Sequence, residues 1–199
     1  MLLREGTNDA TSMVADLQEY EHLVVPADTT VLDIGGHIGL FALEMYKRGA
    51  FRVVSVEPDE DNAWHHKQNL QNHPQHLLLE AAVTDFDGST TLYVNKGRNK
   101  GRHSVAEFRN SYPTRVASVE FLKLLYWVQP DVLKIDCEGA EYLFNWSPFP
   151  NCVRNIAIEY HDLPNTDADR IHDTLGVFGF KQMYLTPEER SYRLAIYTL

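Results

Sequence analysis

The sequence contains little cysteine, no long apolar run and no excess of positive charge. Its two cysteines, Cys137 and Cys152, are too few to indicate a disulfide framework or a cysteine zinc site. No stretch approaches the ~20 apolar residues of a membrane span, and residues 1–6 lack the apolar core of a signal peptide. We therefore expect a protein of a reducing, cytoplasmic environment without a membrane partner.

The net charge and the composition limit the classes of partner. A formal net charge of −10 disfavours general, sequence-independent binding of nucleic acid by the whole surface. Hydrophobic residues make up 44% and charged residues 23% of the chain, as in an ordinary globular domain. Because 199 residues suffice for one domain with a substantial core, we expect a single domain over residues 1–199.

Residues 31–41 combine a short buried strand, a glycine turn and the start of an amphipathic helix. In the strand, apolar residues surround Asp33, as in a parallel strand covered on both faces. Gly35 and Gly36 permit a sharp turn and a close approach of the backbone to a ligand. Together with the helix start, this pattern predicts a nucleotide-type binding corner.

The glycine spacing distinguishes between nucleotide cofactors. The dinucleotide fingerprint G-x-G-x-x-G fits in neither register, which disfavours an NAD-type oxidoreductase. The spacing that fits is Asp-x-Gly-x-x-x-Gly, formed by Asp33, Gly35 and Gly39. It resembles the first motif of class I S-adenosylmethionine (SAM) methyltransferases.

A second strand, over residues 51–58, ends at Glu57 and Pro58. Glu57 lies 18 residues after Gly39, close to the spacing at which an acid binds ribose hydroxyls in a βαβ unit. A carboxylate suits this role because it can accept from both hydroxyls. The alternative is a solvated acid at a strand end, and the upstream glycine turn favours the ribose role. A helix capped by Asp59 is expected next.

Residues 77–83 predict a third strand. Because the end of this strand faces the adenine in a doubly wound sheet, we place the backbone of Ala82 and Val83 near the adenine. An added strand is expected over residues 90–94, where polar and apolar residues alternate. Four nearby histidines have no cysteine or carboxylate among them at ligand spacing, so we interpret them as surface side chains: His65, His66, His73 and His76.

The segment 94–115 is expected to be a basic loop. Between residues 96 and 103 it carries four cations and two glycines in an otherwise acidic protein. It is either a mobile solvated loop or a lid that contacts an anionic group. It lacks the interleaved aromatic residues of a single-stranded nucleic-acid platform.

A cluster of ionisable residues lies within residues 131–141. Lys134 and Asp136 are two apart on one face of a buried strand, and Glu138 and Glu141 follow in the next turn. A charge in a buried strand needs a partner, so Lys134 and Asp136 are expected to pair. The alternatives are a structural ion pair and an active-site cluster, and four ionisable groups around one strand end favour the second.

The rest of the chain alternates strands and helices. Further elements are expected as an N-terminal arm (1–30) with a helix from Thr7 or Asn8 through Leu17, a strand-to-helix segment (116–127), a buried strand (155–161) ending in Glu159 and His161, a helix from Thr166, and two terminal strands (180–186 and 192–199). This order predicts an α/β fold: a doubly wound, mostly parallel seven-stranded sheet with helices on both faces and an antiparallel C-terminal strand pair.

With these motifs in view, the chain resembles the FkbM family of SAM-dependent methyltransferases. The resemblance rests on residues 33–39, on Glu57-Pro58 and above all on residues 133–141, Leu-Lys-Ile-Asp-Cys-Glu-Gly-Ala-Glu. One departure is His37, which stands where the family usually has asparagine.

The resemblance implies a class I methyltransferase fold with SAM as the cofactor. It places the turn from Gly35 to Gly39 at the methionine end of SAM and Glu57 at the ribose. Asp33 or Asp136 would then lie near the cationic amino group of SAM.

Methyl transfer to a hydroxyl also requires a group that removes the proton. The candidates at the carboxyl edge of the sheet are Asp136, Glu138, Glu159 and His161. We expect His161, together with Asp136, to act as the base, because imidazole has a suitable intrinsic pKa. No metal is expected as the first interpretation, although the three carboxylates could hold magnesium.

The predicted function is O-methylation of a hydroxyl on a small molecule or sugar, and an anionic acceptor would suit the basic loop. The alternatives are N-methylation, or methylation of a nucleotide or nucleic acid drawn in by residues 96–103. An NAD-type oxidoreductase and a SAM-binding module without catalysis are less favoured, since the acids around Asp136 indicate chemistry.

Overall fold

The structure is a computed structural model of residues 1–199, and it describes all of them except 8, 10–16, 109, 162, 164–165 and 187–191. Most of the helix expected from Thr7 or Asn8 through Leu17, and the turn between the two terminal strands, lie outside the described residues. The described strands are β1 (Thr30–Ile34), β2 (Arg52–Val56), β3 (Leu77–Leu79), β4 (Ala82–Thr84), β5 (Gly88–Asn95), β6 (Ser111–Glu120), β7 (Val132–Ile135), β8 (Asn155–His161), β9 (Lys181–Leu185) and β10 (Tyr192–Thr198). The described helices are α2 (Leu40–Lys47), α3 (Glu60–Leu70), α4 (Phe121–Val128) and α5 (Ala168–Val177), with short 3-10 turns η1 (Tyr20–His22) and η2 (Ala140–Leu143).

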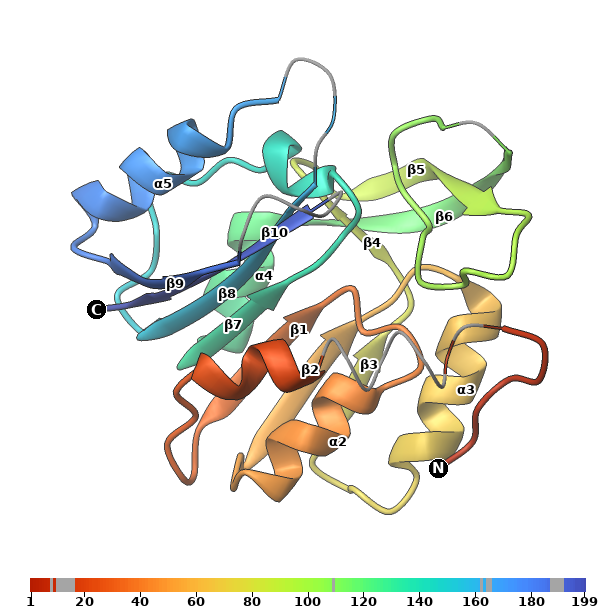
Figure 1. The fold of residues 1–199 in the computed structure, drawn as a ribbon, viewed down its shortest axis with the longest axis horizontal. Coiled ribbons are helices and arrows are strands. Elements are labelled where there is room, and N and C mark those ends of the chain that lie inside the picture. Colours follow the sequence, from red (N-terminus) through yellow and green to blue (C-terminus); the bar gives the residue numbers. More distant parts are fainter. Residues whose placement is uncertain (8, 10–16, 109, 162, 164–165, 187–191) are drawn as a thin grey trace.

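Seven strands form the main sheet, in the order β3-β2-β1-β7-β8-β10-β9 (Figure 1). The pairs from β3 to β8 are parallel, whereas β10 runs antiparallel to both β8 and β9. This arrangement confirms the predicted doubly wound sheet and its antiparallel C-terminal pair. The chain leaves β1 toward β2 on one side and later returns to β7 on the other, so the ends of β1 and β7 flank the point where the strand order reverses. Ligands of open α/β sheets bind at such a point.

Helices cover both faces of this sheet, because successive residues of each strand point to opposite sides. Leu32 and Ile34 of β1 pack in a cluster with Phe121 of α4 and with residues of α5. Val31 faces the other way and packs in a cluster with Phe41 of α2. In Figure 1, α4 lies behind the strands and α2 in front of them. None of the helices in the described ranges is long and apolar enough to cross a membrane.

The expected third strand, residues 77–83, is two strands in two different sheets. β3 pairs with β2, whereas β4 leaves the main sheet and pairs with β6 in a three-stranded sheet of order β4-β6-β5. The break falls at Glu80, which is exposed and interrupts the apolar run. The added strand expected at 90–94 is the longer β5, antiparallel to β6.

The basic loop is shorter than expected, because β5 continues to Asn95 and β6 begins at Ser111. The alternation of apolar residues does not indicate the first half of β6, because that half is polar and contains Pro113. The loop therefore comprises residues 96–110. The helix expected from Thr166 begins at Ala168 instead. The side chain of Asp167, just before it, accepts from two backbone N–H groups and caps the helix.

Three polar residues lie side by side within the core. Asp33 of β1 is in register with Ser55 of β2 on one side and with Lys134 of β7 on the other. All three are buried on the face of the sheet that α2 covers. This polar row lies directly beneath the carboxyl edge of the sheet, where the candidate site is found.

Candidate active site

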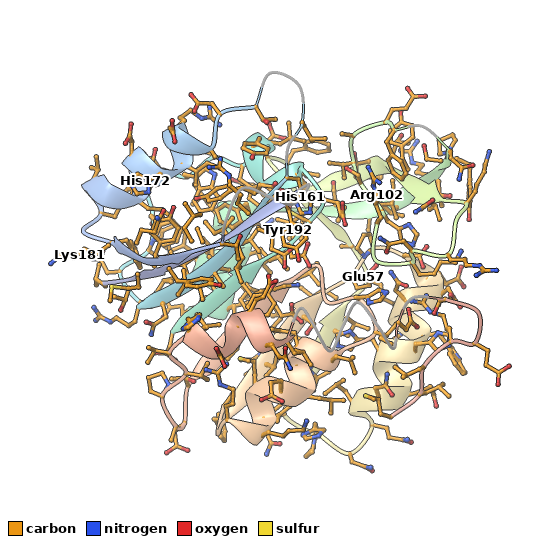
Figure 2. All side chains as sticks on the ribbon, in the orientation of Figure 1. Glu57, Arg102, His161, His172, Lys181 and Tyr192 are labelled. Carbon is orange, nitrogen blue, oxygen red and sulfur yellow. The ribbon has the colours of Figure 1, made fainter. Side chains whose placement is uncertain are left out.

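A cavity of about 360 Å³, called here the main cavity, opens at the carboxyl ends of β1, β2, β7 and β8, and β4 and β5 of the small sheet border it. This volume lies in the range of small-molecule sites. Most of the predicted site residues line it: Gly35, His37, Glu57, Pro58, Ala82, Val83, Asp136, Glu138, Glu159 and His161. Figure 2 shows Glu57 on one side of this region and His161 with Tyr192 on the other.

The glycine turn after β1 is held against its two neighbouring strands. The N–H groups of Gly35 and Gly36 both donate to the carbonyl of Val56, at 3.0 Å. Gly35 has φ of +80°, and a Cβ there would lie 1.7 Å from the carbonyl oxygen of Asp136. Only glycine fits this position, and its backbone faces the main cavity.

The other two glycines of the turn face α3 instead of the main cavity. A Cβ on Gly36 would lie 2.9 Å from the ring of His66, and one on Gly39 would lie 3.1 Å from it. His66 Nδ1 contacts the carbonyl of His37 at 3.0 Å, and its Nε2 contacts His76 Nε2 at 2.9 Å. His66 is fully buried, so the expectation of a surface side chain is wrong for it. The glycines leave the space that its ring fills.

Glu57 accepts three hydrogen bonds from the protein. Its donors are the backbone N–H groups of His37 (2.8 Å) and Asp59 (2.9 Å) and the side chain of Asn62 (3.2 Å). Burial raises the pKa of Glu57 to about 7, although these donors oppose the rise. Burial of His37 and the neighbouring Arg4 cation both lower the pKa of His37 to about 4, so this imidazole is neutral.

The predicted pairing of Lys134 is present and involves two acids. Lys134 Nζ lies 3.3 Å from Asp33 Oδ1 and 3.4 Å from Asp136 Oδ2, and donates to the carbonyl of Gly35 at 2.7 Å. Burial would lower the pKa of Lys134, but the two carboxylates outweigh it and raise the pKa. Asp33 also accepts from the hydroxyl of Ser55 at 2.9 Å. It lies under the turn, outside the lining of the main cavity, whereas Asp136 reaches that lining.

His161 lies among carboxylates at the end of β8. Its Nδ1 is 3.3 Å from Glu141 Oε1, and its Nε2 is 3.5 Å from Glu138 Oε2 and 3.9 Å from Asp136 Oδ1. Burial would lower the pKa of His161, but the hydrogen bond to Glu141 and the neighbouring carboxylates raise it to about 10. A protonated imidazole cannot accept a proton, so this raised pKa opposes the expected role of His161 as the base, and that role stays a prediction.

Two further carboxyls face the same space. Burial raises the pKa of Glu138 to about 7, and it raises the pKa of Glu159 well above its usual range with the help of Asp136. The hydroxyl of Tyr20 donates to Glu159 Oε1 at 2.6 Å. Donor atoms of Asp136, Glu159 and His161 all lie within 4.8 Å of one another.

A second cavity of about 190 Å³, the side cavity, adjoins the main one. Glu138, His161, Tyr192 and Asn99 line both cavities. Arg102 lines the side cavity, with its guanidinium 5.5 Å from the ring centre of Phe108, another lining residue. Figure 2 shows Arg102 beside His161 and Tyr192. A molecule in the side cavity would thus meet one in the main cavity at these shared residues.

Sequence reasoning missed several residues that line the main cavity. Asp9 lies in the opening segment (residues 1–9), which resembles the family but received no predicted site residue, and Arg4 holds Asp9 there at 2.9 Å. Asn62 stands one helical turn after Asp59 on the inner face of α3, and this spacing was a usable signal. His103 belongs to the basic loop, and no sequence pattern indicates that it is buried.

Comparison with known proteins agrees with this geometry. The family model described as "Methyltransferase FkbM domain" matches residues 33–194. Curated relatives named uncharacterized methyltransferases, from Mycobacterium sp. strains KMS, JLS and MCS, are 44% identical over 52 residues. That stretch is 26% of this chain and spans only 20% of the length of those relatives.

Solved methyltransferases share the fold at low sequence identity. An S-adenosylmethionine dependent methyltransferase assigned in Listeria monocytogenes aligns with a TM-score of 0.53 and 12% identity, over 94% of this chain and 98% of that one. The C-terminal domain of precorrin-6Y C5,15-methyltransferase from Rhodobacter capsulatus gives 0.52 and 13%, over 90% and 84%. A Streptococcus pneumoniae protein assigned as a tRNA (m1A22) methyltransferase, solved with SAM, gives 0.51 and 14%, over 94% and 72%. The family match extends over both motif clusters and the strands that carry them, so the chain belongs to the FkbM family of SAM-dependent methyltransferase domains.

Proposed function

We propose that this chain transfers the methyl group of SAM to a hydroxyl of a small molecule or sugar. One observation carries the proposal: the main cavity begins at the glycine turn and Glu57 and ends at Glu138 and His161, which also line the side cavity. SAM in the main cavity would present its methyl group at that junction. An acceptor in the side cavity would approach the methyl group from the other side.

The two ends of SAM match the two ends of the main cavity. Glu57 suits the ribose, since a carboxylate has about four acceptor sites and three protein donors use this one. The ribose hydroxyls can replace the longest of the three contacts, that of Asn62. The carboxylate of Asp136 suits the cationic amino group, and Ala82 and Val83, which line the main cavity, would border the adenine.

The reaction is an in-line displacement, and the enzyme chiefly aligns the two reactants. A lone pair of the acceptor oxygen forms a bond to the methyl carbon. The carbon–sulfur bond breaks, and its electron pair stays on the sulfur of S-adenosylhomocysteine. The hydroxyl proton passes to a carboxylate, for which we propose Glu138 because it lines both cavities and lies beside the junction.

The side cavity supports an acceptor with an anionic group. Arg102 supplies a cation at its wall, and among the four cations between residues 96 and 103 it is the one that lines this cavity. A carboxylate or phosphate on the acceptor would pair with the guanidinium. The second candidate is an acceptor methylated on nitrogen, or a nucleotide, because the basic loop borders the same cavity.

Isothermal titration calorimetry with SAM tests the cofactor assignment. Binding of one SAM per chain is expected, weakened at least tenfold in Glu57→Ala and unchanged in Glu60→Gln, which alters an exposed acid of α3. Acceptor panels of sugar and small-molecule alcohols, with nucleotides as a separate set, then test the substrate class. With an acceptor that is methylated in these panels, Glu138→Gln should lower kcat at unchanged SAM affinity. Normal SAM affinity in Glu57→Ala would contradict the ribose assignment.

A further inference from the structure

We propose that Asp136, Glu159 and His161 form a binding site for one divalent metal ion. The three residues come from the ends of two adjacent parallel strands, β7 and β8. Each offers one donor atom, and these atoms lie within 4.8 Å of one another. Ligands of one ion at bond lengths near 2.1 Å are roughly 3 Å or more apart, so a small inward movement completes the site.

Two of the three proposed ligands make no hydrogen bond to a described residue through the atoms that face the cluster. His161 is only 8% exposed, yet its Nε2 makes no hydrogen bond to any described residue, the nearest carboxylate oxygen being 3.5 Å away. The side chain of Asp136 likewise makes no hydrogen bond within the described part of the chain, its contacts being the charge pairs with Lys134 and His161. Both groups line the main cavity. An imidazole nitrogen that faces a cavity between carboxylates and makes no hydrogen bond is suited to an ion.

The orientation of His161 is fixed from behind. Its Nδ1 contacts Glu141 Oε1 at 3.3 Å, and the same oxygen accepts from the backbone N–H of His161 at 3.0 Å. Glu141 is fully buried and also accepts from the N–H of Gly139 at 2.9 Å. A metal-binding histidine usually donates its other N–H to a carboxylate in this way. This contact leaves Nε2 as the free ligand atom.

Glu159 is oriented by a similar contact. Tyr20 is 3% exposed and donates its hydroxyl to Glu159 Oε1 at 2.6 Å. The carboxylate is thereby held at the base of the main cavity with its second oxygen available. Two of the three proposed ligands therefore have a dedicated supporting group outside the cluster.

The charges around the cluster favour a cation. Five carboxyl groups lie around this strand edge: Asp33, Asp136, Glu138, Glu141 and Glu159. In the described part of the chain, Lys134 pairs with two of them and Arg102 acts on Glu138 from the side cavity. A divalent ion would offset the excess of negative charge. An ion and a proton would compete for Nε2 of His161, as at other histidine metal ligands.

Two carboxylate oxygens and one imidazole nitrogen suit a first-row divalent ion such as Mn²⁺ better than Mg²⁺, which prefers oxygen ligands alone. The ion's role rests on the proposed function: next to the junction of the two cavities, it would bind the acceptor oxygen and favour loss of its proton. The existence of the site does not depend on that role.

Titration of the full chain with Mn²⁺, followed by the electron paramagnetic resonance signal of free Mn²⁺, tests the site in the absence of SAM. One saturable site is expected. Glu159→Gln and His161→Ala should each weaken it at least tenfold, and Glu80→Gln, the same change at an exposed acid outside the main cavity, should leave it unchanged. Because the first two variants alter buried residues, Tyr20→Phe serves as a milder one that removes only the supporting hydroxyl, with an expected loss of ~10-fold.

Lack of saturable Mn²⁺ binding in the folded wild-type chain would overturn the site, and so would unchanged affinity in both Glu159→Gln and Tyr20→Phe. SAM binding is measured separately on the same samples. If the chain binds SAM but does not bind Mn²⁺, the metal site is overturned and the proposed function still stands. If the chain binds Mn²⁺ but does not bind SAM, the metal site is supported and the proposed cofactor site is contradicted.

Discussion

At the scale of single residues, the ionisation of Glu57 makes SAM affinity depend on pH. Burial raises its pKa to about 7, so the carboxylate form that accepts from ribose hydroxyls is populated above this pH and lost below it. With a pKa near 7, about a tenth of the sites are ionised at pH 6, so the dissociation constant of SAM should be ~10-fold higher at pH 6 than at pH 8. Calorimetric titrations across this range measure it.

The sign of this dependence distinguishes Glu57 from other groups. In Glu57→Gln the affinity should be lower and flat between pH 6 and 8, whereas Glu60→Gln should follow the wild-type curve. The same raised pKa means that the buried carboxylate costs folding stability, and this cost grows as pH rises from the unfolded value near 4.5 to about 7. An affinity that rises on acidification would contradict the assignment.

Gly36 illustrates a glycine that is needed for space. A Cβ there would lie 2.9 Å from the buried ring of His66 and 3.0 Å from the Cβ of Ser55. Gly36→Ala should therefore destabilise the protein by about 1–3 kcal/mol, as overpacking does, and weaken SAM binding by displacing the turn. Gly176→Ala is the control: nothing lies within 4 Å of a Cβ in this helical position, so a gain of about 0.5–1 kcal/mol is expected. Urea unfolding measures both, and a fully stable Gly36→Ala would show that His66 can move.

At the scale of strands, the polar row beneath the site makes the protein sensitive to the loss of a single charge. Lys134 is buried and pairs with Asp33 and Asp136 across two adjacent strands. Lys134→Met removes the cation and leaves the fully buried Asp33 without a charge partner, which should cost about 3–5 kcal/mol. Urea unfolding should show this loss, and the double variant Asp33→Leu/Lys134→Met should recover part of it because no charge is then left unpaired.

The matched control for this change is Lys123→Met, which breaks an exposed pair with Asp87. It should leave the unfolding free energy nearly unchanged, because exposed ion pairs contribute little. Equal effects of the two lysine substitutions would show that the buried row does not stabilise the strand edges.

The strands that position the site could be predicted because they are mostly apolar and carry an acid at or next to their end. β1, β2, β7 and β8 have this form, and acids such as Glu57 and Asp136 meet at one edge because parallel strands point the same way. The first half of β6 could not be predicted, since it is polar and owes its conformation to pairing with β5. The burial of His66 depends on side-chain space left by glycines of another element, and single-sequence patterns do not report such space.

At the scale of the whole molecule, distant segments close the main cavity together. Arg4 joins three of them: its guanidinium contacts Asp9 at 2.9 Å, Asn62 of α3 at 2.6 Å and His37 of the glycine turn at 2.8 Å. Asp9 and His37 line the main cavity, so these contacts hold the opening segment over the proposed SAM site. Sequence patterns miss this arrangement because its partners lie up to 58 residues apart.

Arg4→Met should therefore loosen the opening segment and release SAM faster. The buried carboxylate of Asp9 would lose its cation, and the segment would lose its contacts to α3 and to His37. We expect the dissociation rate of SAM, measured by stopped-flow fluorescence, to rise ~10-fold, which corresponds to about 1.4 kcal/mol. Unfolding of the main sheet should change little, because the described residues of this segment add no strand to it. Arg115→Met, which removes an exposed arginine of the small sheet, is the matched control and should leave the rate unchanged. Equal dissociation rates for Arg4→Met and wild type would show that SAM leaves by a route that the opening segment does not cover.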